Sequence, residues 1–321
     1  MLQLDATELA ARLDRKALID ALDEAFRTPA VVPLRQRYDI EPEAPSGQGG
    51  TLLVMPAWRV GGSLGIKLAT IYPDNAQRGL PAVAATYLLL DASTGQPRAL
   101  IDGEELTLRR TGAASALASR HLSAPHASRL LMIGTGRLAP HLIESHAVAR
   151  PLREVRIWGR RAERSHALAA SLNRLDLRVE AVDDLEAAVQ WADVVSCGTL
   201  SRVPLVRGAW LRAGQHVDLV GAFTREMCEA DDAAIVRAEL YVDTRAGALE
   251  ESGEIAGAIA RKVIDASAVR AELSELASGR FSRSHAGAVT LFKSVGTALE
   301  DLVAAELALA RPAPTAIPRR S

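Results

Sequence analysis

The residues with the clearest chemical use form a short turn at positions 134–139. An apolar run over 130–133 is typical of a buried parallel strand. It is followed by Gly134-x-Gly136-x-x-Ala139 and then by a helical pattern to about Ala149. In this order the first glycine permits a tight turn, the second lets the backbone approach phosphate oxygens, and the helix N-terminus supplies unbonded N–H groups. A bare strand–helix turn is the alternative. The order favours a dinucleotide-binding turn, whose predicted contacts are Gly134, Thr135, Gly136, Arg137 and Leu138.

The end of the next predicted strand, Val155–Trp158, indicates which dinucleotide is bound. An NAD site usually places Asp or Glu there, roughly 20 residues after the glycines, to bind the ribose 2′-hydroxyl. This chain has Arg160 and Arg161 instead. Guanidinium groups bind phosphate oxygens bidentately, so we expect NADPH, with NADH possible. The alternative is a solvated helix start, although cations at a helix N-terminus oppose its dipole.

The elements around these residues predict a parallel sheet. Strand and helix patterns alternate from residue 129 onward, with the clearest helices at 162–172 and 185–191. Such alternation is typical of a doubly wound α/β Rossmann sheet. The expected strands are 130–134, 154–159, 177–182, 193–197, 216–221 and 239–243.

The first 120 residues have a different pattern. A helix is expected over 7–26, with one apolar face, and a Pro-, Gly- and Ser-rich loop over 41–50. Short strands separated by turns then predict an antiparallel sheet. Thr107 is the expected N-cap of a helix to about His121, rich enough in small residues for another backbone to pack closely. The expected strands are 51–55, 63–72, 83–90 and 97–102, and the apolar face comprises Leu9, Leu13, Leu18, Ile19 and Leu22.

These patterns predict two domains. We expect an α+β domain over 1–120, completed by a returning helix from about 289 to 310, and a Rossmann domain over 121–288. The Pro- and Arg-rich segment 311–321 is expected to be disordered.

Composition excludes several classes of protein. The 321 residues carry a net charge of −1 and no basic block, so we expect no nucleic-acid partner. No apolar run is long enough for a membrane span and no signal peptide is evident. Two cysteines fit a reducing, cytoplasmic location rather than a disulfide framework. The seven histidines have no metal-ligand spacing, so no metal is expected.

Eight short blocks occur in the order typical of one known family. They are Pro33-Leu34-Arg35, Met55-Pro56-Ala57, Gly65-Ile66-Lys67-Leu68, Asp102-Gly103, Leu108-Arg109-Arg110-Thr111-Gly112-Ala113, Gly134-Thr135-Gly136, Val155-Arg156-Ile157-Trp158 and Phe292-Lys293-Ser294-x-Gly296. On these blocks the chain resembles the ornithine cyclodeaminase/mu-crystallin family over nearly its whole length. The resemblance implies a homodimer with an N-terminal substrate and dimerisation domain, a nicotinamide-binding Rossmann domain, and an active site in the cleft between the two domains.

The resemblance gives Arg35, Lys67 and Arg110 a shared role, because they match family residues around the substrate carboxylate. Their own contexts agree. Lys67 lies in an apolar strand between Ile66 and Leu68, and a buried cation requires an anion. Arg110 lies in the first turns of its predicted helix, where a lone cation gains nothing from the dipole. Singly, each has an alternative: loop solvation for Arg35, a snorkelling side chain for Lys67 and a solvated helix face for Arg110.

One position departs from the family's cyclodeaminases. Those enzymes resemble one another in an Asp two residues after a Val-Gly pair, where it handles the substrate amine, whereas here Val220-Gly221 is followed by Ala222 and Phe223. A phenyl ring can neither accept a proton nor pair with an ammonium group. Glu226 is acidic but is shifted by three residues. The departure argues against cyclodeamination, and equally against an alanine dehydrogenase.

The segment Gly221-Ala222-Phe223-Thr224, with Met227 and Glu229-Ala230-Asp231 after it, instead resembles the family's ketimine reductases. This likeness implies NADPH-dependent reduction of cyclic imino acids, Δ1-pyrroline-2-carboxylate to proline or Δ1-piperideine-2-carboxylate to pipecolate. Three cations would fix the carboxylate, and Met55 and Phe223 would line the pocket, with ordinary core packing as the alternative for Phe223. Two other functions stay open: a cyclodeaminase-like lyase with tightly held NAD, and an NADPH-dependent binding protein like the mu-crystallins. Ring size is not determined, because one methylene changes binding by only ~1–3 kcal/mol.

Further cofactor contacts are expected where Rossmann strands end. Cys197 and Thr199 follow one strand and Ala222 another, so their backbones should pass beneath the cofactor. Cys197 has no base placed near it by sequence and is not expected to be a nucleophile. Lys293 matches a family motif near the nicotinamide, and the alternative is a helix N-terminal turn.

Overall fold

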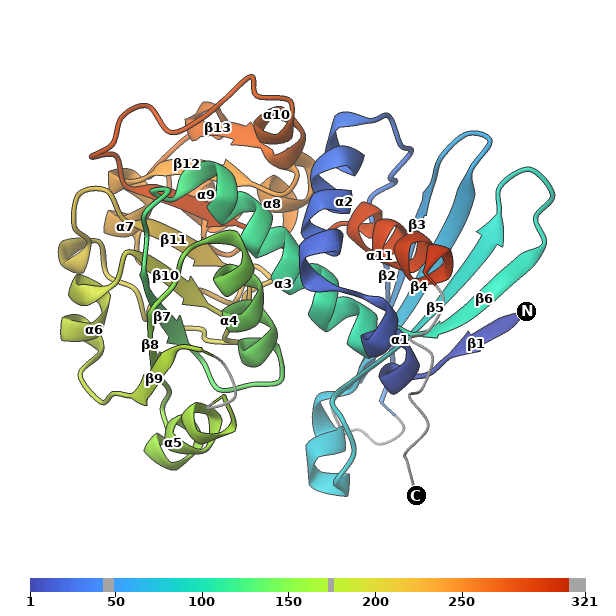
Figure 1. Ribbon diagram of the computed structural model, residues 1–321, viewed down its shortest axis with the longest axis horizontal. Helices are drawn as coiled ribbons and strands as arrows, with labels where there is room; N and C mark the ends of the chain where they lie inside the picture. The colour runs from blue at the N-terminus through green and yellow to red at the C-terminus, as the bar shows by residue number, and fades with distance from the viewer. Residues whose placement is uncertain (43–48, 173–175, 312–321) are drawn as a thin grey trace. The chain divides into compact units, whose positions relative to one another are not determined.

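The computed structural model describes residues 1–42, 49–172 and 176–311 (Figure 1). The chain forms two compact units. Unit 1 comprises Met1–Ala21, Thr28–Arg110 and Thr297–Ser321, and unit 2 comprises Leu22–Arg27 and Thr111–Gly296. The expected disordered segment 311–321 lies outside the described residues from position 312 onward, as does most of the predicted loop at 41–50.

Unit 1 is built on a six-stranded sheet in the order β1-β6-β5-β4-β3-β2. Neighbours from β2 to β6 are antiparallel, as predicted, and the unpredicted β1 pairs with β6 in parallel. The strands are β1 (Leu2–Leu4), β2 (Gln36–Ile40), β3 (Gly50–Trp58), β4 (Ser63–Ile71), β5 (Val83–Asp91) and β6 (Pro97–Asp102).

Helix α11 (Ala298–Ala310) packs against β3 and β4 of this sheet (Figure 1). Because side chains alternate between the faces of a strand, Lys67 shares the covered face with Met55 opposite it on β3 and Tyr87 opposite it on β5. All three side chains are buried. The covered face therefore carries a buried lysine in an otherwise apolar row.

Two N-terminal helices replace the single helix predicted over 7–26. They are α1 (Ala6–Arg12) and α2 (Arg15–Arg27). The prediction was wrong at Asp14, whose side chain accepts the amide hydrogen of Ala17 and starts a second helix. The five leucine and isoleucine side chains predicted on one face are all buried, as expected.

Helix α3 (Gly103–Leu122) begins earlier than predicted. Thr107 is not its N-cap: the Thr107 hydroxyl donates to the carbonyl of Gly103, and Asp102 accepts the amide hydrogen of Glu105. Asp102 ends β6 and is itself a good capping residue, so the helix starts directly after the strand. As a result Arg110 lies in the middle of α3 rather than in its first turns.

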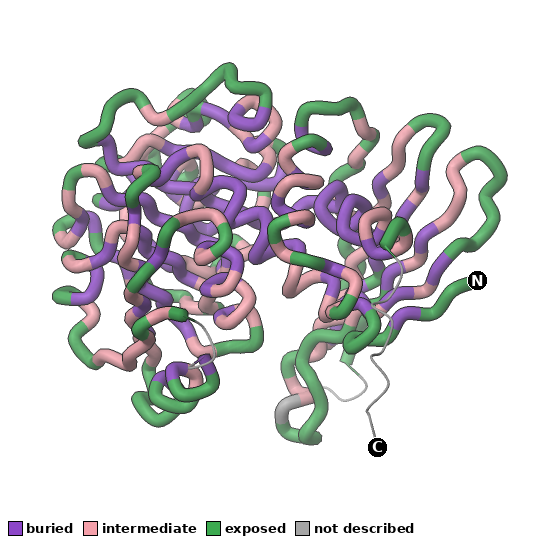
Figure 2. The backbone as a smooth tube through the Cα atoms, in the orientation of Figure 1, coloured by how far each residue is buried: buried purple, intermediate pink, exposed green. Residues whose placement is uncertain are grey.

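Unit 2 is an eight-stranded, fully parallel sheet in the order β13-β12-β14-β11-β10-β7-β8-β9. Buried residues line its strands (Figure 2). On β7, Leu131 and Ile133 join one apolar cluster while Leu130 and Met132 join another. Clusters on both faces are the signature of a doubly wound sheet, so the predicted Rossmann fold is confirmed. The strands are β7 (Arg129–Ile133), β8 (Glu154–Trp158), β9 (Arg178–Ala181), β10 (Val194–Cys197), β11 (His216–Leu219), β12 (Glu239–Val242), β13 (Val269–Glu272) and β14 (Thr290–Lys293).

The helices of unit 2 lie between these strands in the chain. Those at 138–149 and 185–191 have the predicted bounds, and the helix predicted over 162–172 ends one residue early, at Ser171. In α3, a Cβ on Gly112 would lie 2.7 Å from the carbonyl oxygen of His141 on α4, so the close helix packing predicted from small residues is confirmed. The helices are α4 (Leu138–Ala149), α5 (Ala162–Ser171), α6 (Leu185–Trp191), α7 (Asp232–Arg237), α8 (Arg245–Glu251), α9 (Ile255–Ala260) and α10 (Leu273–Ala277).

The predicted helix from about 289 was wrong in its first part. Residues 290–293 form β14, which lies between β11 and β12, and α11 starts only at Ala298. A short apolar run does not distinguish a buried strand from a helix. Gly296, with φ of 83°, separates the two elements.

Within the described ranges, none of the helices combines the length and apolar character needed to cross a bilayer.

Candidate active site

The glycine turn predicted from the sequence follows β7 at the carboxyl edge of the parallel sheet. Gly134 has φ of 117°, and a Cβ there would lie 2.8 Å from the carbonyl oxygen of Gly198. Both facts require glycine at this position. Gly136 is exposed, and a Cβ there would meet no atom within 4 Å. The turn therefore presents open backbone just before α4, which suits a bound phosphate.

The end of β8 lies beside this turn. A Cβ on Gly159 would lie 2.8 Å from the Thr135 side chain, so the two loops approach closely. Arg160 and Arg161 follow and are exposed at the start of α5. Within the described part of the chain, neither guanidinium group has a hydrogen-bond or ion-pair partner. Both are available to an anionic group at this edge.

A buried glutamate, to which the sequence analysis assigns no role in the site, joins the loops after β10 and β11. Glu229 accepts hydrogen bonds from the Thr199 amide (2.7 Å) and hydroxyl (3.0 Å), and from the amides of Gly221 (3.0 Å) and Ala222 (3.2 Å). Its side chain is fully buried. Thr199 and Ala222 are two of the predicted cofactor contacts, and the structure brings them to this one carboxylate.

Lys293, another predicted cofactor contact, ends strand β14 rather than starting a helix. Its side chain is fully buried, and its Nζ lies 3.1 Å from Glu254 and 3.7 Å from Glu229. Burial opposes the charge, but the two carboxylates together hold the pKa of Lys293 above its usual value. The ammonium group thus belongs to a buried ion cluster, and a contact with the cofactor stays a prediction.

The two carboxylates also affect their neighbours. Burial, with the negative charge of Glu254, raises the pKa of Glu229. Cys197 is buried beside the cluster, and burial raises the pKa of its thiol well above the usual value. A thiol held protonated in this way is a poor nucleophile, in agreement with the sequence analysis.

In unit 1, Lys67 is the centre of a second buried ion cluster. Its side chain is 4% exposed, and its Nζ lies 2.7 Å from Asp301 on α11. Burial lowers the pKa of Lys67 to about 8, with further lowering by the positive charges of Arg110 and Arg35, while Asp301 raises it. The structure therefore brings Lys67 and Arg110 to one carboxylate, and the positive charge of Arg35 acts on the same lysine.

Arg110 is buried against the same helix. Its Nε lies 3.0 Å from Asp301 and its Nη1 lies 2.6 Å from Glu300. Both carboxylates are completely buried. Glu300 and Asp301 thus hold two buried cations in place, and the positive charge of Arg35 acts on the same group. Cations held in this way are suited to an anionic ligand.

Sequence reasoning missed both carboxylates of α11, although a signal was present. Glu300 and Asp301 are adjacent acids within a helix whose neighbours Leu299, Leu302 and Val303 are all buried. A helix that is apolar around its circumference is a core helix. Fully buried acids in its first turn must therefore be paired with buried cations.

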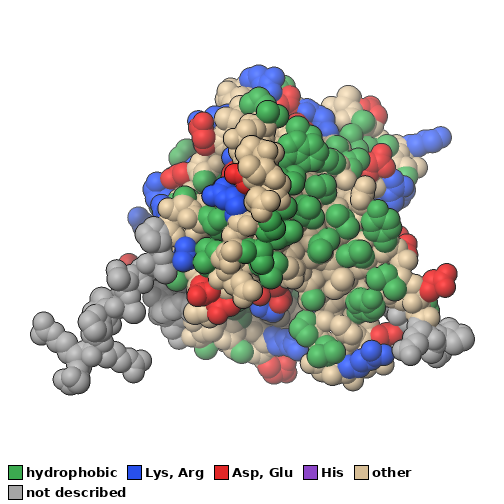
Figure 3. All heavy atoms as spheres, turned by 90° about the vertical axis from the view of Figure 1, so that its right-hand side faces the viewer, with side chains coloured by type: hydrophobic (Ala, Val, Ile, Leu, Met, Phe, Trp, Pro, Cys, Tyr) green, Lys and Arg blue, Asp and Glu red, His purple; other side chains and the backbone are tan. Residues whose placement is uncertain are grey.

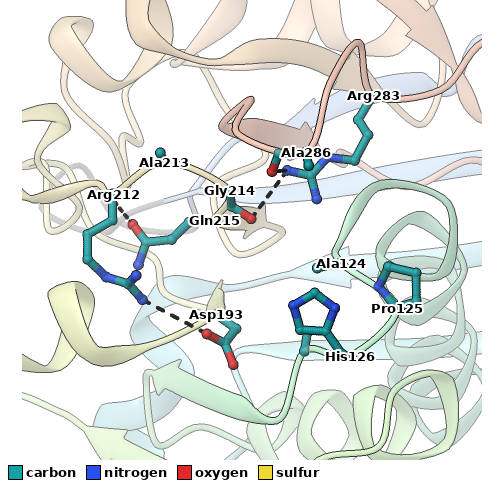
Figure 4. Close-up of a pocket in the computed structure, with 11 residues that line it drawn as sticks. Ala124, Pro125, His126, Asp193, Arg212, Ala213, Gly214, Gln215, Arg283 and Ala286 are labelled. Atoms are coloured by element: carbon teal, nitrogen blue, oxygen red, sulfur yellow. Dashed lines mark hydrogen bonds and ion pairs between the residues drawn. The ribbon is translucent and has the colours of Figure 1, made fainter.

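A pocket of about 420 Å³ lies at the opposite, amino edge of the parallel sheet in unit 2 (Figure 4). It includes two arginines, but their guanidinium groups bind backbone carbonyls: Arg212 binds that of Ala192, and Arg283 those of Ala286 and Ala288. These arginines hold strand ends together and are not available to a ligand.

The polar side chains buried around Asp218 do not form a nucleophilic triad. Ser196 donates to Asp218 (2.7 Å), and His146 lies 3.2 Å from that carboxylate, but the hydroxyl is bonded to the acid rather than to the imidazole. The arrangement is buried and lacks the serine–histidine bond of a nucleophilic triad. In the described ranges, no three His, Cys, Asp or Glu side chains are grouped to hold a metal.

Comparison with known proteins decides the family. The family model described as "Ornithine cyclodeaminase/mu-crystallin family" matches residues 1–311. The chain belongs to this family. A Δ1-pyrroline-2-carboxylate reductase of Colwellia psychrerythraea is 35% identical over 306 residues, covering 94% of this chain and 96% of that protein. The ketimine reductase mu-crystallin of Rattus norvegicus is 36% identical over 259 residues, covering 80% of this chain and 79% of that protein.

The fold of the family is shared throughout the chain. The structure of Thermococcus litoralis Δ1-pyrroline-2-carboxylate reductase in complex with NADH and L-proline superimposes with a TM-score of 0.90 at 32% identity. The match covers 97% of each chain. The ornithine cyclodeaminase/mu-crystallin family therefore accounts for both units described above.

Replacing Asp301 by Asn should destabilise the protein strongly. Lys67 and Arg110 would stay buried without their shared carboxylate, which costs about 3–5 kcal/mol for a broken buried pair. Urea unfolding measures the loss. The matched control is Glu306→Gln on the same helix, because its pair with Arg59 is about one quarter exposed and should contribute no more than about 1 kcal/mol. Equal losses in the two variants would contradict the proposed role of the Asp301 carboxylate.

Proposed function

We propose that the protein is an NADPH-dependent reductase of cyclic ketimine carboxylates, acting on Δ1-pyrroline-2-carboxylate, Δ1-piperideine-2-carboxylate or both. The observation that carries the proposal is the pair of buried cations, Lys67 and Arg110, which Glu300 and Asp301 hold in place, with the positive charge of Arg35 acting on the same group. Such a group is suited to a substrate carboxylate. The relatives named for this reaction, and the structure of one of them with NADH and L-proline, support the same conclusion.

The chain's own residues would hold the substrate in place. Lys67 and Arg110, fixed by α11, would bind the carboxylate with charge-assisted hydrogen bonds, and Arg35 would complete the contact. Met55, opposite Lys67 on β3, would contribute an apolar surface, and Phe223 a second. In a planar imine held by its carboxylate, the imine carbon bonded to that carboxylate is fixed in position. The reaction needs this carbon to be oriented for hydride transfer.

The cofactor would bind at the carboxyl edge of the parallel sheet. The open backbone at Gly136 and the N-terminus of α4 would hold its pyrophosphate, and Arg160 and Arg161 its 2′-phosphate. When bound, NADPH supplies the hydride that joins the imine carbon, and the ring nitrogen keeps its proton as it becomes an amine. The protonated imine is already electrophilic, so the residues need to orient it rather than to supply a strong base.

Phe223 argues against the lyase alternative. Cyclodeamination needs a group that accepts a proton from, or pairs with, the substrate amine, and a phenyl ring does neither. Cyclic imine reduction makes no such demand on this position. Ammonia release from L-ornithine without net cofactor turnover would support the lyase instead, and one coupled assay distinguishes the two reactions.

Replacing Lys67 by Met should abolish reduction while leaving the cofactor bound. We expect kcat/KM for either imine to fall by about 100- to 1,000-fold, because a buried charged partner of the carboxylate is lost. NADPH affinity, measured by fluorescence titration, should change by less than about twofold. Full turnover in the variant would exclude the carboxylate contact.

The pH profile of the wild type provides an independent check. Lys67 is protonated below its pKa of about 8 and neutral above it. Carboxylate binding needs the charged form, so kcat/KM should decline as the pH rises through about 8. In the Lys67→Met variant this decline should be absent.

Replacing Arg160 by Asp should reverse the choice of cofactor. A carboxylate would repel the 2′-phosphate and accept hydrogen bonds from a ribose hydroxyl, so the Kd for NADPH should rise by about 100-fold or more while that for NADH changes little. Arg153→Asp is the matched control, because Arg153 is exposed at the other end of the same strand. Equal losses of NADPH and NADH affinity in the Arg160 variant would refute the assignment to the 2′-phosphate.

We further propose that the protein is a homodimer joined through the six-stranded sheet of unit 1. The face of this sheet away from α11 carries aliphatic side chains in register on adjacent strands, and hydrophobic side chains gather on this side of the molecule (Figure 3). Contiguous apolar surface of this kind is typical of an interface. The side chains are Leu52, Val54 and Pro56 on β3, Leu64, Ile66 and Leu68 on β4, Leu88 and Leu90 on β5, and Leu100 on β6.

Replacing Leu68 by Glu should give monomers. Leu68 is 46% exposed in the middle of β4, so a carboxylate there would be buried without a partner in the dimer. Sedimentation velocity should report a dimer for the wild type and a monomer for this variant. Val60→Glu is the control, because Val60 is 93% exposed in the turn between β3 and β4. A dimer that persists in the Leu68→Glu variant would contradict this interface.

A further inference from the structure

The carboxyl edge of the parallel sheet contains a buried carboxylate that does not face solvent yet contacts two loops of the expected cofactor site. Glu229 uses one carboxylate oxygen for the loop after β10, through Thr199, and the other for the loop after β11, through Gly221 and Ala222. All four bonds come from N–H or O–H donors. A neutral acid or amide in its place would present a hydrogen instead of a lone pair to at least one of these donors, and so would lose at least one bond.

The two loops approach each other closely beside Glu229. A Cβ on Gly221 would lie 2.0 Å from the Thr199 nitrogen and 2.7 Å from a Glu229 oxygen. The loop after β10 in turn contacts the glycine turn, because a Cβ on Gly134 would lie 2.8 Å from the Gly198 carbonyl oxygen. A displacement at Glu229 would therefore reach the phosphate-binding turn through two backbone contacts.

Glu229 is itself fixed on its other sides. Its amide donates to Glu254 (2.6 Å), and its carbonyl accepts the amides of Leu205 and Val206 (2.9 Å each). Lys293, 3.1 Å from Glu254, provides the positive charge of the cluster. Glu229 lies outside the helices and strands. Its contacts with the segments of Thr199, Gly221, Leu205 and Glu254 nevertheless hold it in place.

We infer that Glu229 is a positioning residue for the nicotinamide cofactor: it holds the loops after β10 and β11 at the spacing that the cofactor requires, without touching the cofactor itself. This inference rests on the proposed cofactor edge and goes beyond it, because it assigns cofactor affinity to a residue outside the binding surface. Preorganised loops bind more tightly because less ordering accompanies binding.

The test is cofactor affinity in the absence of imine. NADPH and NADH are titrated into the full-length protein by fluorescence, and Glu229→Gln should raise the Kd of both by about tenfold or more. The kcat with saturating NADPH should fall by less than about threefold, since the catalytic cations of unit 1 are unchanged. A loss of general stability alone would not separate Kd from kcat in this way.

Two control variants separate positioning from simple loss of a buried charge. Glu254→Gln removes a charge from the same cluster but keeps all four bonds of Glu229 to the loops. Asp193→Asn removes a carboxylate that accepts the amides of Ser128 and Arg129 at the opposite edge of the same sheet. Both variants should keep the cofactor Kd within about twofold of the wild type while lowering the melting temperature.

Several results would overturn the inference. An unchanged Kd in folded Glu229→Gln would do so, as would equal increases in all three variants. If Glu229→Gln does not fold, Glu229→Asp takes its place. This variant keeps the charge beside Lys293 but is one methylene too short to reach both loops. An unchanged cofactor Kd in Glu229→Asp would equally overturn the inference. A wild-type protein that binds neither NADPH nor NADH would overturn the proposed function and this inference together, whereas normal wild-type binding with an unaffected Glu229 variant overturns this inference alone.

Discussion

The structure depends on the cost of burying a charge away from water. Removing an ion from solvent costs several kcal/mol even after the protein relaxes, so a buried cation persists only beside a carboxylate or another anion. Both ion clusters follow this rule. In unit 1, Lys67 and Arg110 are buried because α11 brings Glu300 and Asp301 to them. In unit 2, Glu229 and Glu254 are buried because β14 ends with Lys293.

The two clusters differ in composition, and this difference matches the roles proposed for them. The buried side chains of unit 1 comprise two cations and two carboxylates, with the positive charge of Arg35 acting on them. In unit 2 the cluster comprises one cation and two carboxylates, and backbone amides and a hydroxyl surround the carboxylate of Glu229. One cluster is therefore suited to binding a carboxylate directly, and the other to holding loops together.

Features that depend on neighbours along the chain could be predicted from the sequence. The glycine turn and most strands are of this kind, because each depends on residue type and local order. Glu300, Asp301 and Glu229 could not be assigned in this way, since their partners lie far away in sequence and only the fold brings them together. The family resemblance identified the cations but gave no information on what balances them.

Errors in the predicted elements have a similar origin. The segment 290–293 was predicted as helix because a short run with apolar residues at Val289, Leu291 and Phe292 fits either structure, and only pairing with β11 and β12 decides for a strand. Thr107 and Asp102 are both good helix caps, and the choice between them depends on where β6 ends. Local preference was ambiguous in each case, and long-range pairing resolved it.

The position of α11 in the chain has a consequence for how the protein is made. Lys67 and Arg110 leave the ribosome long before Glu300 and Asp301, which are about two hundred residues further on. Until α11 emerges, the sheet of unit 1 lacks the α11 carboxylates that pair with these two side chains and the cover for the face that bears them. Residues 111–296, in contrast, precede α11, so the nascent chain should acquire its parallel sheet first and close the remaining layer only after α11 has been made.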